Sequence, residues 1–342
     1  MQLPSKQYRA VNRIILIGNG FDLAHGFDLS FTSFIKHLIG KTIDLVKANL
    51  ESKSNFLRIE VKLGYDQILK QNLLHDEPLE ALGHLKRLPH QFVVKESSLL
   101  KKILKHMNDM KWVDLELVYF NELKENVETK AFGNIKDLNN QMNYLRDELK
   151  EYIKGKCIID PNTANTAIAR QMTEQCYGSN FRINNFANNI LVNIHGTLDG
   201  DDKENGQMMI FGYGDEKNEK YLKFENSDAP IEAHELIKSY KYLEDISYRQ
   251  VINFINQGDD FEVVIMGHSC GQSDRTLLRT IFNHDRCIAI RPFYFERPDG
   301  ADDYFEKSVA IAMCFDDKEK FRDIMSPKPE CEPLIQARQI EN

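Results

Sequence analysis

The chain has 342 residues, of which 42% are hydrophobic and 28% are charged, so a wholly disordered chain is excluded. Its 44 Lys and Arg against 52 Asp and Glu give a formal net charge of -8, which does not indicate nucleic-acid binding. The cysteines are scattered without a C-x-x-C pair, which argues against a zinc ribbon and favours a reducing compartment. Since no apolar run approaches the ~20 residues of a membrane span, we expect a cytoplasmic protein without a metal or a membrane partner.

Residues 13–17 (R-I-I-L-I) predict the first strand, because consecutive apolar, largely β-branched residues are typical of a strand in a buried parallel sheet. Gly18 and Gly20 follow it directly. Glycines at this place let the backbone approach a phosphate and turn its N–H groups toward it. A third glycine comes too late for G-x-G-x-x-G, so a tight turn and a nucleotide-binding loop both stay open. Asp22 and His25 either contact a ligand or cap this turn.

Residues 30–156 show helical periodicity, with apolar residues at three- and four-residue steps. Ser30 and Thr32 are candidate N-caps for the first helix. Further helical segments are expected at 56–74, 99–107, 113–123 and 135–153. We interpret the whole stretch as a helical insertion after the first strand, from which no sheet grows.

Strand patterns return after the insertion. They lie at 157–159, 190–194, 208–211, 261–266 and 287–290, with a hairpin expected between 194 and 208 and helices at 246–255 and 274–282. This order favours an α/β fold with a doubly wound, mostly parallel sheet. The predicted domains are a discontinuous core (11–29 and 157–325), the helical insertion (30–156) and a loosely attached tail (326–342).

Three further places carry candidate chemistry. His195 and Gly196 end the strand predicted before them, where a histidine can act as a base or can be a structural loop residue. Asn162 follows another predicted strand and belongs to a helix cap or to a polar ligand shelf. Trp112 and Glu116 are one helical turn apart, and we expect a core tryptophan and a solvated or cap-bonded carboxylate.

Residues 267–271 (G-H-S-C-G) fit the G-x-S-x-G nucleophile elbow of serine hydrolases, in the expected strand–turn–helix context. The histidine needed after the nucleophile would have to be His284, which is expected to point away from Ser269. We therefore prefer a second nucleotide-contacting turn, with Asp274 near the start of the next helix. A serine hydrolase stays the alternative.

Several of these motifs recur in chain order in one protein family. They are I-L-I-G-N-G-F-D-L-A-H-G at 15–26, W-V-D-L-E at 112–116, I-H-G at 194–196, I-F-G-Y at 210–213 and G-H-S-C-G-Q-S-D at 267–274. Over residues 13–284 the chain resembles AbiH-type phage abortive-infection proteins. The resemblance implies an antiphage effector with a phage-derived trigger or partner protein, and a homo-oligomer stays open.

The AbiH family is distantly similar to sirtuin-like NAD-binding domains, which implies a sirtuin-like or Rossmann-like core. Because the four-cysteine zinc module of sirtuin deacylases is missing, the resemblance implies hydrolysis of NAD to nicotinamide and ADP-ribose, with His195 as base and Asn162 orienting water. The implied cofactor-binding residues are Gly18, Asn19, Gly20, Phe21, Asp22, His25, Gly196, Gly267, Ser269 and Asp274. In this scheme the first glycines hold the pyrophosphate, and Ser269 and Asp274 hold the adenosine ribose. A non-catalytic sensor or toxin component that uses the fold as a scaffold stays open.

Overall fold

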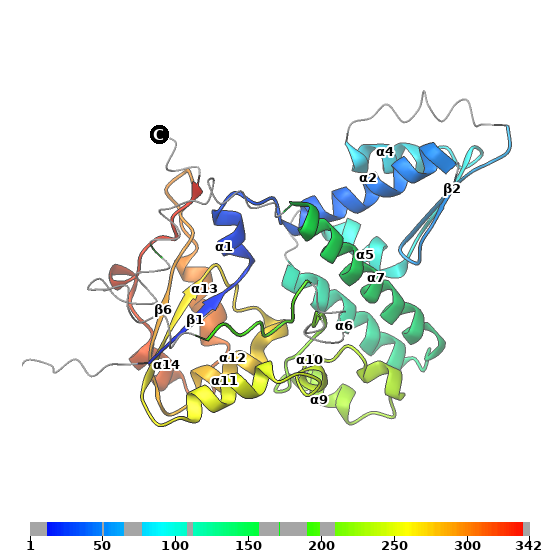
Figure 1. Ribbon diagram of the computed structural model, residues 1–342. Coiled ribbons are helices and arrows are strands. Elements are labelled where there is room, and N and C mark those ends of the chain that lie inside the picture. The colour runs from blue at the N-terminus through cyan, green and yellow to red at the C-terminus, as the bar shows by residue number, and fades with distance from the viewer. Residues whose placement is uncertain are drawn as a thin grey trace, which may run out of the picture. The chain divides into compact units, whose positions relative to one another are not determined.

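The computed structural model describes residues 12–49, 51–64, 77–107, 112–156, 171, 190–198 and 209–337. These residues group into two compact units. The α/β unit takes the described residues of Met1–Phe27, Ile158–Ile194 and Tyr242–Asn342, and the helical unit takes those of Asp28–Cys157 and His195–Lys241. Figure 1 labels the elements of both units along the chain.

A three-stranded parallel sheet in the order β1–β5–β6 forms the centre of the α/β unit. Its strands are β1 (Asn12–Ile17), β5 (Phe261–Met266) and β6 (Cys287–Pro292), and each lies where a run of apolar residues predicts a strand. The central β5 is the most buried of the three strands, since each of its residues except Glu262 is buried. The predicted mixed α/β class with a parallel sheet is confirmed, while the doubly wound, sirtuin-like arrangement stays a prediction.

Helices surround this sheet in the chain order expected for β-α-β connections. They are α1 (Asn19–Ala24), α11 (Ser247–Asn256), η4 (Gln272–Asp274), α12 (Arg275–Phe282), α13 (Tyr304–Ala312), α14 (Lys318–Ile324) and η5 (Lys328–Glu330). Helix α12 joins β5 to the parallel β6, as a crossover must. The helices predicted at 246–255 and 274–282 are confirmed by α11 and by η4 with α12.

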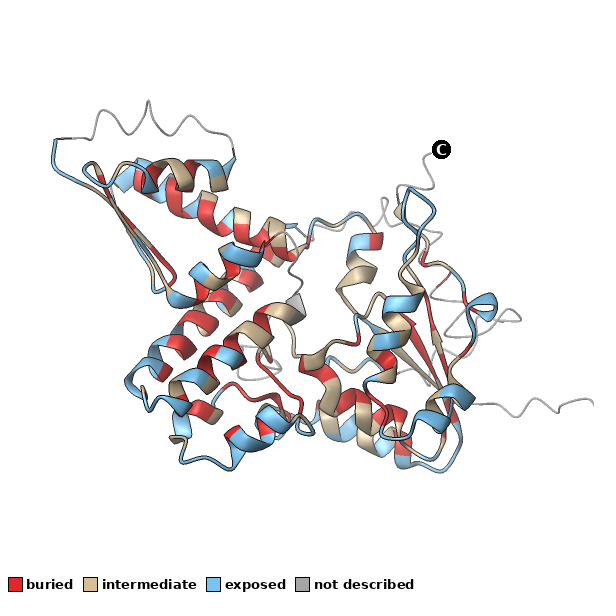
Figure 2. Ribbon diagram, turned by 180° about the vertical axis from the view of Figure 1, so that it is seen from behind, coloured by how far each residue is buried: buried red, intermediate tan, exposed pale blue. Residues whose placement is uncertain are grey.

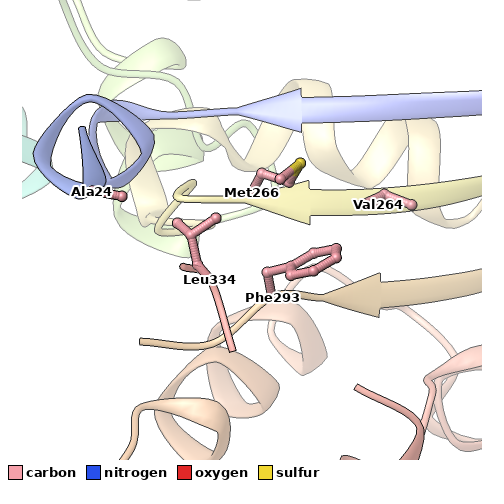
Figure 3. Close-up of a cluster of buried hydrophobic side chains, with 5 residues drawn as sticks. All are labelled: Ala24, Val264, Met266, Phe293 and Leu334. Carbon is pink, nitrogen blue, oxygen red and sulfur yellow. The ribbon is translucent and has the colours of Figure 1, made fainter. Parts of the chain in front are cut away.

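The predicted loose attachment of the tail at 326–342 is wrong for its described part. Leu334 is 4% exposed and packs in a hydrophobic cluster with Ala24, Val264, Met266 and Phe293 (Figure 3). The Leu334 N–H donates to the Tyr294 carbonyl at 2.7 Å. The Gln171 side chain donates to Pro333 at 3.0 Å and accepts from Ile335 at 3.1 Å. The tail is therefore attached by a buried side chain and by backbone hydrogen bonds, which its Pro- and Glu-rich composition conceals.

The helical unit contains long helices that are buried on one side, as Figure 2 shows by the alternation of buried and exposed positions along them. The helix α2 (Phe31–Asn49) starts after Ser30, whose Oγ accepts from the Ser33 N–H at 3.1 Å, so the predicted N-cap is confirmed. The other helices are α4 (Pro78–Lys86), α5 (Ser98–His106), α6 (Trp112–Glu128), α7 (Gly133–Lys156), α9 (Glu219–Glu225), η3 (Ile231–His234) and α10 (Lys238–Lys241).

The insertion also contains a sheet, so the prediction that no sheet grows from it is wrong. The strands β2 (Glu51–Lys53), β3 (Leu57–Val61) and β4 (Phe92–Glu96) pair antiparallel. In β3 the buried Leu57 and Ile59 alternate with charged residues, which is the two-residue period of a half-buried strand. The helix predicted at 56–74 is therefore wrong for residues 57–61, and residues 65–74 lie outside the described part.

The strand predicted at 190–194 is also absent, because residues 190–193 have no regular structure and a turn follows at Ile194 and His195. The hairpin with 208–211 does not form as two strands, although the Ile210 N–H donates to the His195 carbonyl at 2.9 Å. The domain prediction placed 195–241 in the core, whereas His195–Lys241 group with the helical unit. The strand predicted at 157–159 lies outside the described residues.

Candidate functional site

Two glycine loops of the α/β unit meet at the carboxyl ends of their strands. The first glycine loop (residues 18–26) follows β1, and the second glycine loop (residues 267–271) follows β5. Because β1 and β5 are parallel neighbours with Ile17 opposite Met266, both loops leave the sheet at the same edge. The Gly18 N–H donates to the Met266 carbonyl at 3.1 Å, and the Gly20 N–H donates to the Gly267 carbonyl at 2.9 Å.

The glycines of both loops are required by this close approach. A Cβ on Gly18 would lie 2.6 Å from the His268 Cα, and one on Gly20 would lie 2.7 Å from the Gly267 oxygen. Gly267 has a φ of +71°, and a Cβ there would lie 2.0 Å from the Phe21 nitrogen. In this structure both amides donate to the backbone and are not turned toward a ligand, so the predicted pyrophosphate contact of this loop stays a prediction.

Two side chains of the first glycine loop remain open to a ligand. Burial raises the pKa of the Asp22 carboxyl above its ordinary value, and the nearby His25 lowers it in part. The Nδ1 of His25 lies 2.9 Å from the Phe21 carbonyl oxygen, and since a carbonyl only accepts, Nδ1 carries the proton and Nε2 is left as an acceptor. The His25 ring also packs edge-on against the Phe21 ring at 4.6 Å.

The second glycine loop holds its own polar side chains in place. The Nδ1 of His268 accepts from the Cys270 N–H at 3.0 Å, and its Nε2 lies 3.6 Å from the Asp274 carboxylate. The Lys307 ammonium on α13 lies 3.5 Å from the His268 carbonyl oxygen. Burial raises the pKa of the Cys270 thiol, so this cysteine is not a ready thiolate nucleophile.

This geometry does not support the serine-hydrolase alternative. The non-glycine residue with positive φ in the second glycine loop is Cys270, at +52°, rather than Ser269. His284 packs against Phe261, the first residue of β5, at 5.7 Å, whereas Ser269 follows the last residue of that strand. His284 therefore lies at the opposite end of β5, as expected. The nitrogens of His268 are engaged as described, so it does not present a base to Ser269.

His195 and Gly196 lie on a turn of the helical unit, so their predicted position at a strand end is wrong. Gly196 has a φ of +81°, which explains a glycine there. Asn162 lies outside the described residues. Of the residues predicted for the site, the structure thus brings together those of the two glycine loops in one unit, while the roles of His195 and Asn162 stay predictions.

A buried ion pair connects two other motifs of the sequence. Glu116 of α6 accepts from the Gly212 N–H at 3.1 Å and from the Lys238 ammonium at 3.1 Å. The side chains of Glu116 and Lys238 are 8% and 2% exposed. Next to this pair, the Tyr213 and Phe120 rings stack at 4.1 Å. The expectation of a solvated or cap-bonded Glu116 is therefore wrong, because its carboxylate is buried and accepts from the Gly212 N–H and the Lys238 ammonium.

Lys238 could not be recognised from the sequence, because its sequence neighbours (K-S-Y-K) do not distinguish a buried lysine from a solvated one. The glutamate in W-V-D-L-E is the stronger signal, because a carboxylate on a helix rich in apolar residues requires a partner when it is buried. The side chain of Trp112 lies outside the described part.

A comparison with known protein families decides which family these motifs belong to. The family model for bacteriophage abortive infection AbiH matches residues 14–295. The chain belongs to the AbiH family. The matched residues include both glycine loops, and also Glu116 with its partners Gly212 and Lys238. No curated protein and no solved structure matches this AbiH-family chain.

A cavity of about 710 Å³ opens along α2 in the helical unit of this AbiH-family chain, next to Tyr152 of α7. Two of its lysines are paired with carboxylates, and the third, Lys156, lies over the Tyr152 ring at 5.7 Å. Lys36 lies 2.9 Å from Glu77, and Lys41 lies 2.6 Å from Glu148. The cavity is therefore balanced in charge and does not present a cluster of unpaired cations to an anion.

None of the helices that the structure describes combines the length and apolarity needed to cross a membrane. Within the same described ranges, no group of three or more His, Cys, Asp and Glu side chains is placed to hold a metal ion.

Proposed function

We propose that the α/β unit binds a nucleotide at the two glycine loops, with NAD as the ligand, and that this binding serves the phage abortive-infection role that AbiH membership suggests. The observation that carries the proposal is the contact between the loops after β1 and β5. In open parallel sheets, ligands bind outside the carboxyl ends of the strands. Here that edge carries two loops that approach each other closely, together with the polar side chains of Asp22, His25 and Asp274.

The residues of the second glycine loop would contact the adenosine ribose. Ser269 offers a hydroxyl, and Asp274 offers a carboxylate whose position is set by His268. The glycines act by allowing the two loops to approach each other. Because the Gly18 and Gly20 amides are used within the protein, Asn19 and the side chains around it would carry the contacts of the first glycine loop.

We propose NAD hydrolysis as the reaction, with His195 and Asn162 in the roles implied by the sirtuin-like resemblance. Water adds to the C1′ carbon of the nicotinamide ribose, the glycosidic bond breaks with its electron pair going to nicotinamide, and a base takes the proton of the water. Nicotinamide leaves as a neutral molecule, so no acid is needed. A general base typically contributes ~10²–10⁴-fold in rate.

The full-length protein incubated with NAD tests both steps. Calorimetric titration measures binding, and chromatography measures released nicotinamide. His195→Ala should remove turnover and keep the melting temperature, with His90→Ala on the exposed turn before β4 as the matched control. Since an effector can stay silent until it is triggered, cellular NAD is also followed during phage challenge.

Each outcome distinguishes one function from the others. Binding without turnover in both settings would support the non-catalytic sensor or scaffold. No binding of NAD by the wild type would refute the nucleotide proposal. A loss of melting temperature in His195→Ala, without a specific loss of turnover, would assign His195 a structural role.

A further inference from the structure

The first glycine loop leaves two hydrogen-bond acceptors without donors. The Asp22 carboxylate is partly buried and makes no hydrogen bond within the described part of the chain. His25 donates through Nδ1 to the Phe21 carbonyl oxygen, and in the neutral ring its Nε2 is an acceptor to which none of the described residues donates. A partly buried carboxylate without a hydrogen bond is uncommon in folded proteins and calls for a physical explanation.

Both acceptors are held in position before any ligand arrives. Asp22 and His25 are three residues apart, so they lie on the same face of α1 and its C-terminal cap. The backbone of this helix is fixed by the contacts of Gly20 and Phe21 with the second glycine loop. The His25 ring is further restrained by the edge-on Phe21 ring. A ligand therefore does not have to order these groups, which favours binding.

The chemistry of the pair restricts what it can bind. A phosphate is an acceptor at neutral pH and would face a carboxylate of the same charge. The complement of two neighbouring acceptors is a group with two neighbouring donors, and the adjacent hydroxyls of a ribose are such a group. Partial burial raises the pKa of Asp22, and the nearby His25 lowers it in part.

We propose that Asp22 and His25 bind the vicinal hydroxyls of a nucleotide ribose, and that the first glycine loop is a sugar-recognition loop rather than a phosphate cradle. This inference rests on the proposed nucleotide function and deepens it. It also explains why the Gly18 and Gly20 amides are used inside the protein. The contact made to the ligand comes from side chains, and the glycines only position the helix that carries them.

The test combines protein variants with ligand analogues. Calorimetric titration of the full chain compares NAD with two analogues, which lack the 2′-hydroxyl on the adenosine ribose or on the nicotinamide ribose. Because the second glycine loop is proposed to contact the adenosine ribose, we expect the wild type to bind the analogue without the nicotinamide-ribose hydroxyl about tenfold or more weakly than NAD, as befits the loss of a hydrogen bond to a charged group. In Asp22→Ala and in His25→Phe, which keeps the ring packing on Phe21, that difference should largely disappear.

The controls separate this inference from the function on which it rests. Asp44→Ala removes an exposed aspartate of α2 and should keep the full difference, and melting temperatures show that each variant is folded. Equal binding of NAD and both analogues by the wild type would overturn the inference while leaving nucleotide binding intact, and so would a difference that persists in Asp22→Ala. No binding of NAD by the wild type would overturn the proposed function and the inference together.

Discussion

Replacing Lys238 by methionine would leave the Glu116 carboxylate as an uncompensated charge inside the helical unit. The two side chains are 2% and 8% exposed, and the ammonium nitrogen lies 3.1 Å from the carboxylate. Water cannot reach the site to replace the lost cation. We therefore expect the free energy of unfolding to fall by about 3–5 kcal/mol, the cost of breaking a buried pair from one side.

A double variant tests whether this cost comes from the charge. Glu116→Gln combined with Lys238→Met removes both charges and keeps an oxygen that accepts the Gly212 N–H. The double variant should recover most of the lost free energy of unfolding, because neutral groups carry a much smaller desolvation cost than charged ones. Denaturant unfolding followed by circular dichroism compares the variants. Lys47→Met is the control, since the exposed pair of Lys47 with Asp44 is worth at most about 1 kcal/mol.

Two results would refute the reasoning. Lys238→Met could prove no more destabilising than Lys47→Met, which would mean that Glu116 finds water or another partner. Alternatively, the double variant could be as unstable as the single one, which would mean that packing of the lysine stem, and not charge, dominates the site.

Three further predictions concern the α/β unit. Asp22→Asn should raise the free energy of unfolding at neutral pH by about 0.5–2 kcal/mol. Because the folded pKa of Asp22 is raised above 3.8, the stability of the wild type falls as the pH rises through that raised pKa. Urea midpoints measured across this pH window should fall in the wild type and stay level in the variant. Leu334→Ala should lower the free energy of unfolding by about 2–5 kcal/mol, since Leu334 is 4% exposed, whereas a loosely attached tail would change it by less than ~0.5 kcal/mol. A fluorophosphonate probe should leave Ser269 unmodified, and a Ser269 adduct in mass spectrometry would restore the serine-hydrolase alternative. Ser269→Ala should weaken NAD binding only modestly.

Local patterns in the sequence were sufficient for the sheet of the α/β unit and for its two loops. The runs that became β1, β5 and β6 are short and apolar, and a strand buried on both faces needs little more than that composition. The cap at Ser30 and the helix α12 were equally local, because their signals lie within a few residues of the structure they specify. Parallel pairing then brings the two loops to one edge of the sheet, as the strand order predicts.

The wrong predictions of secondary structure arose where one local pattern fits two different structures. The run around Leu57 and Ile59 suits a strand or part of a helix, and pairing with Phe92–Glu96 decided for the strand. The apolar segment at 190–194 looks like a strand, yet residues 190–193 have no regular structure, and within the described ranges no strand pairs with them. Propensity is a weak prior in such segments, and tertiary contacts override it.

The sequence by itself determined the class of the protein: an α/β sheet, two glycine loops after its strands, a long helical insertion and the ordered motifs of the AbiH family. Only the tertiary structure decided what those motifs do. Glu116 and Lys238 are 122 residues apart, and no spacing rule connects them. The amides of Gly18 and Gly20 could have faced a ligand, but they donate to the carbonyls of Met266 and Gly267. Burial and hydrogen-bond partners are set by segments that come together only in the folded chain. The sequence by itself therefore leaves more than one role open for the same residue type.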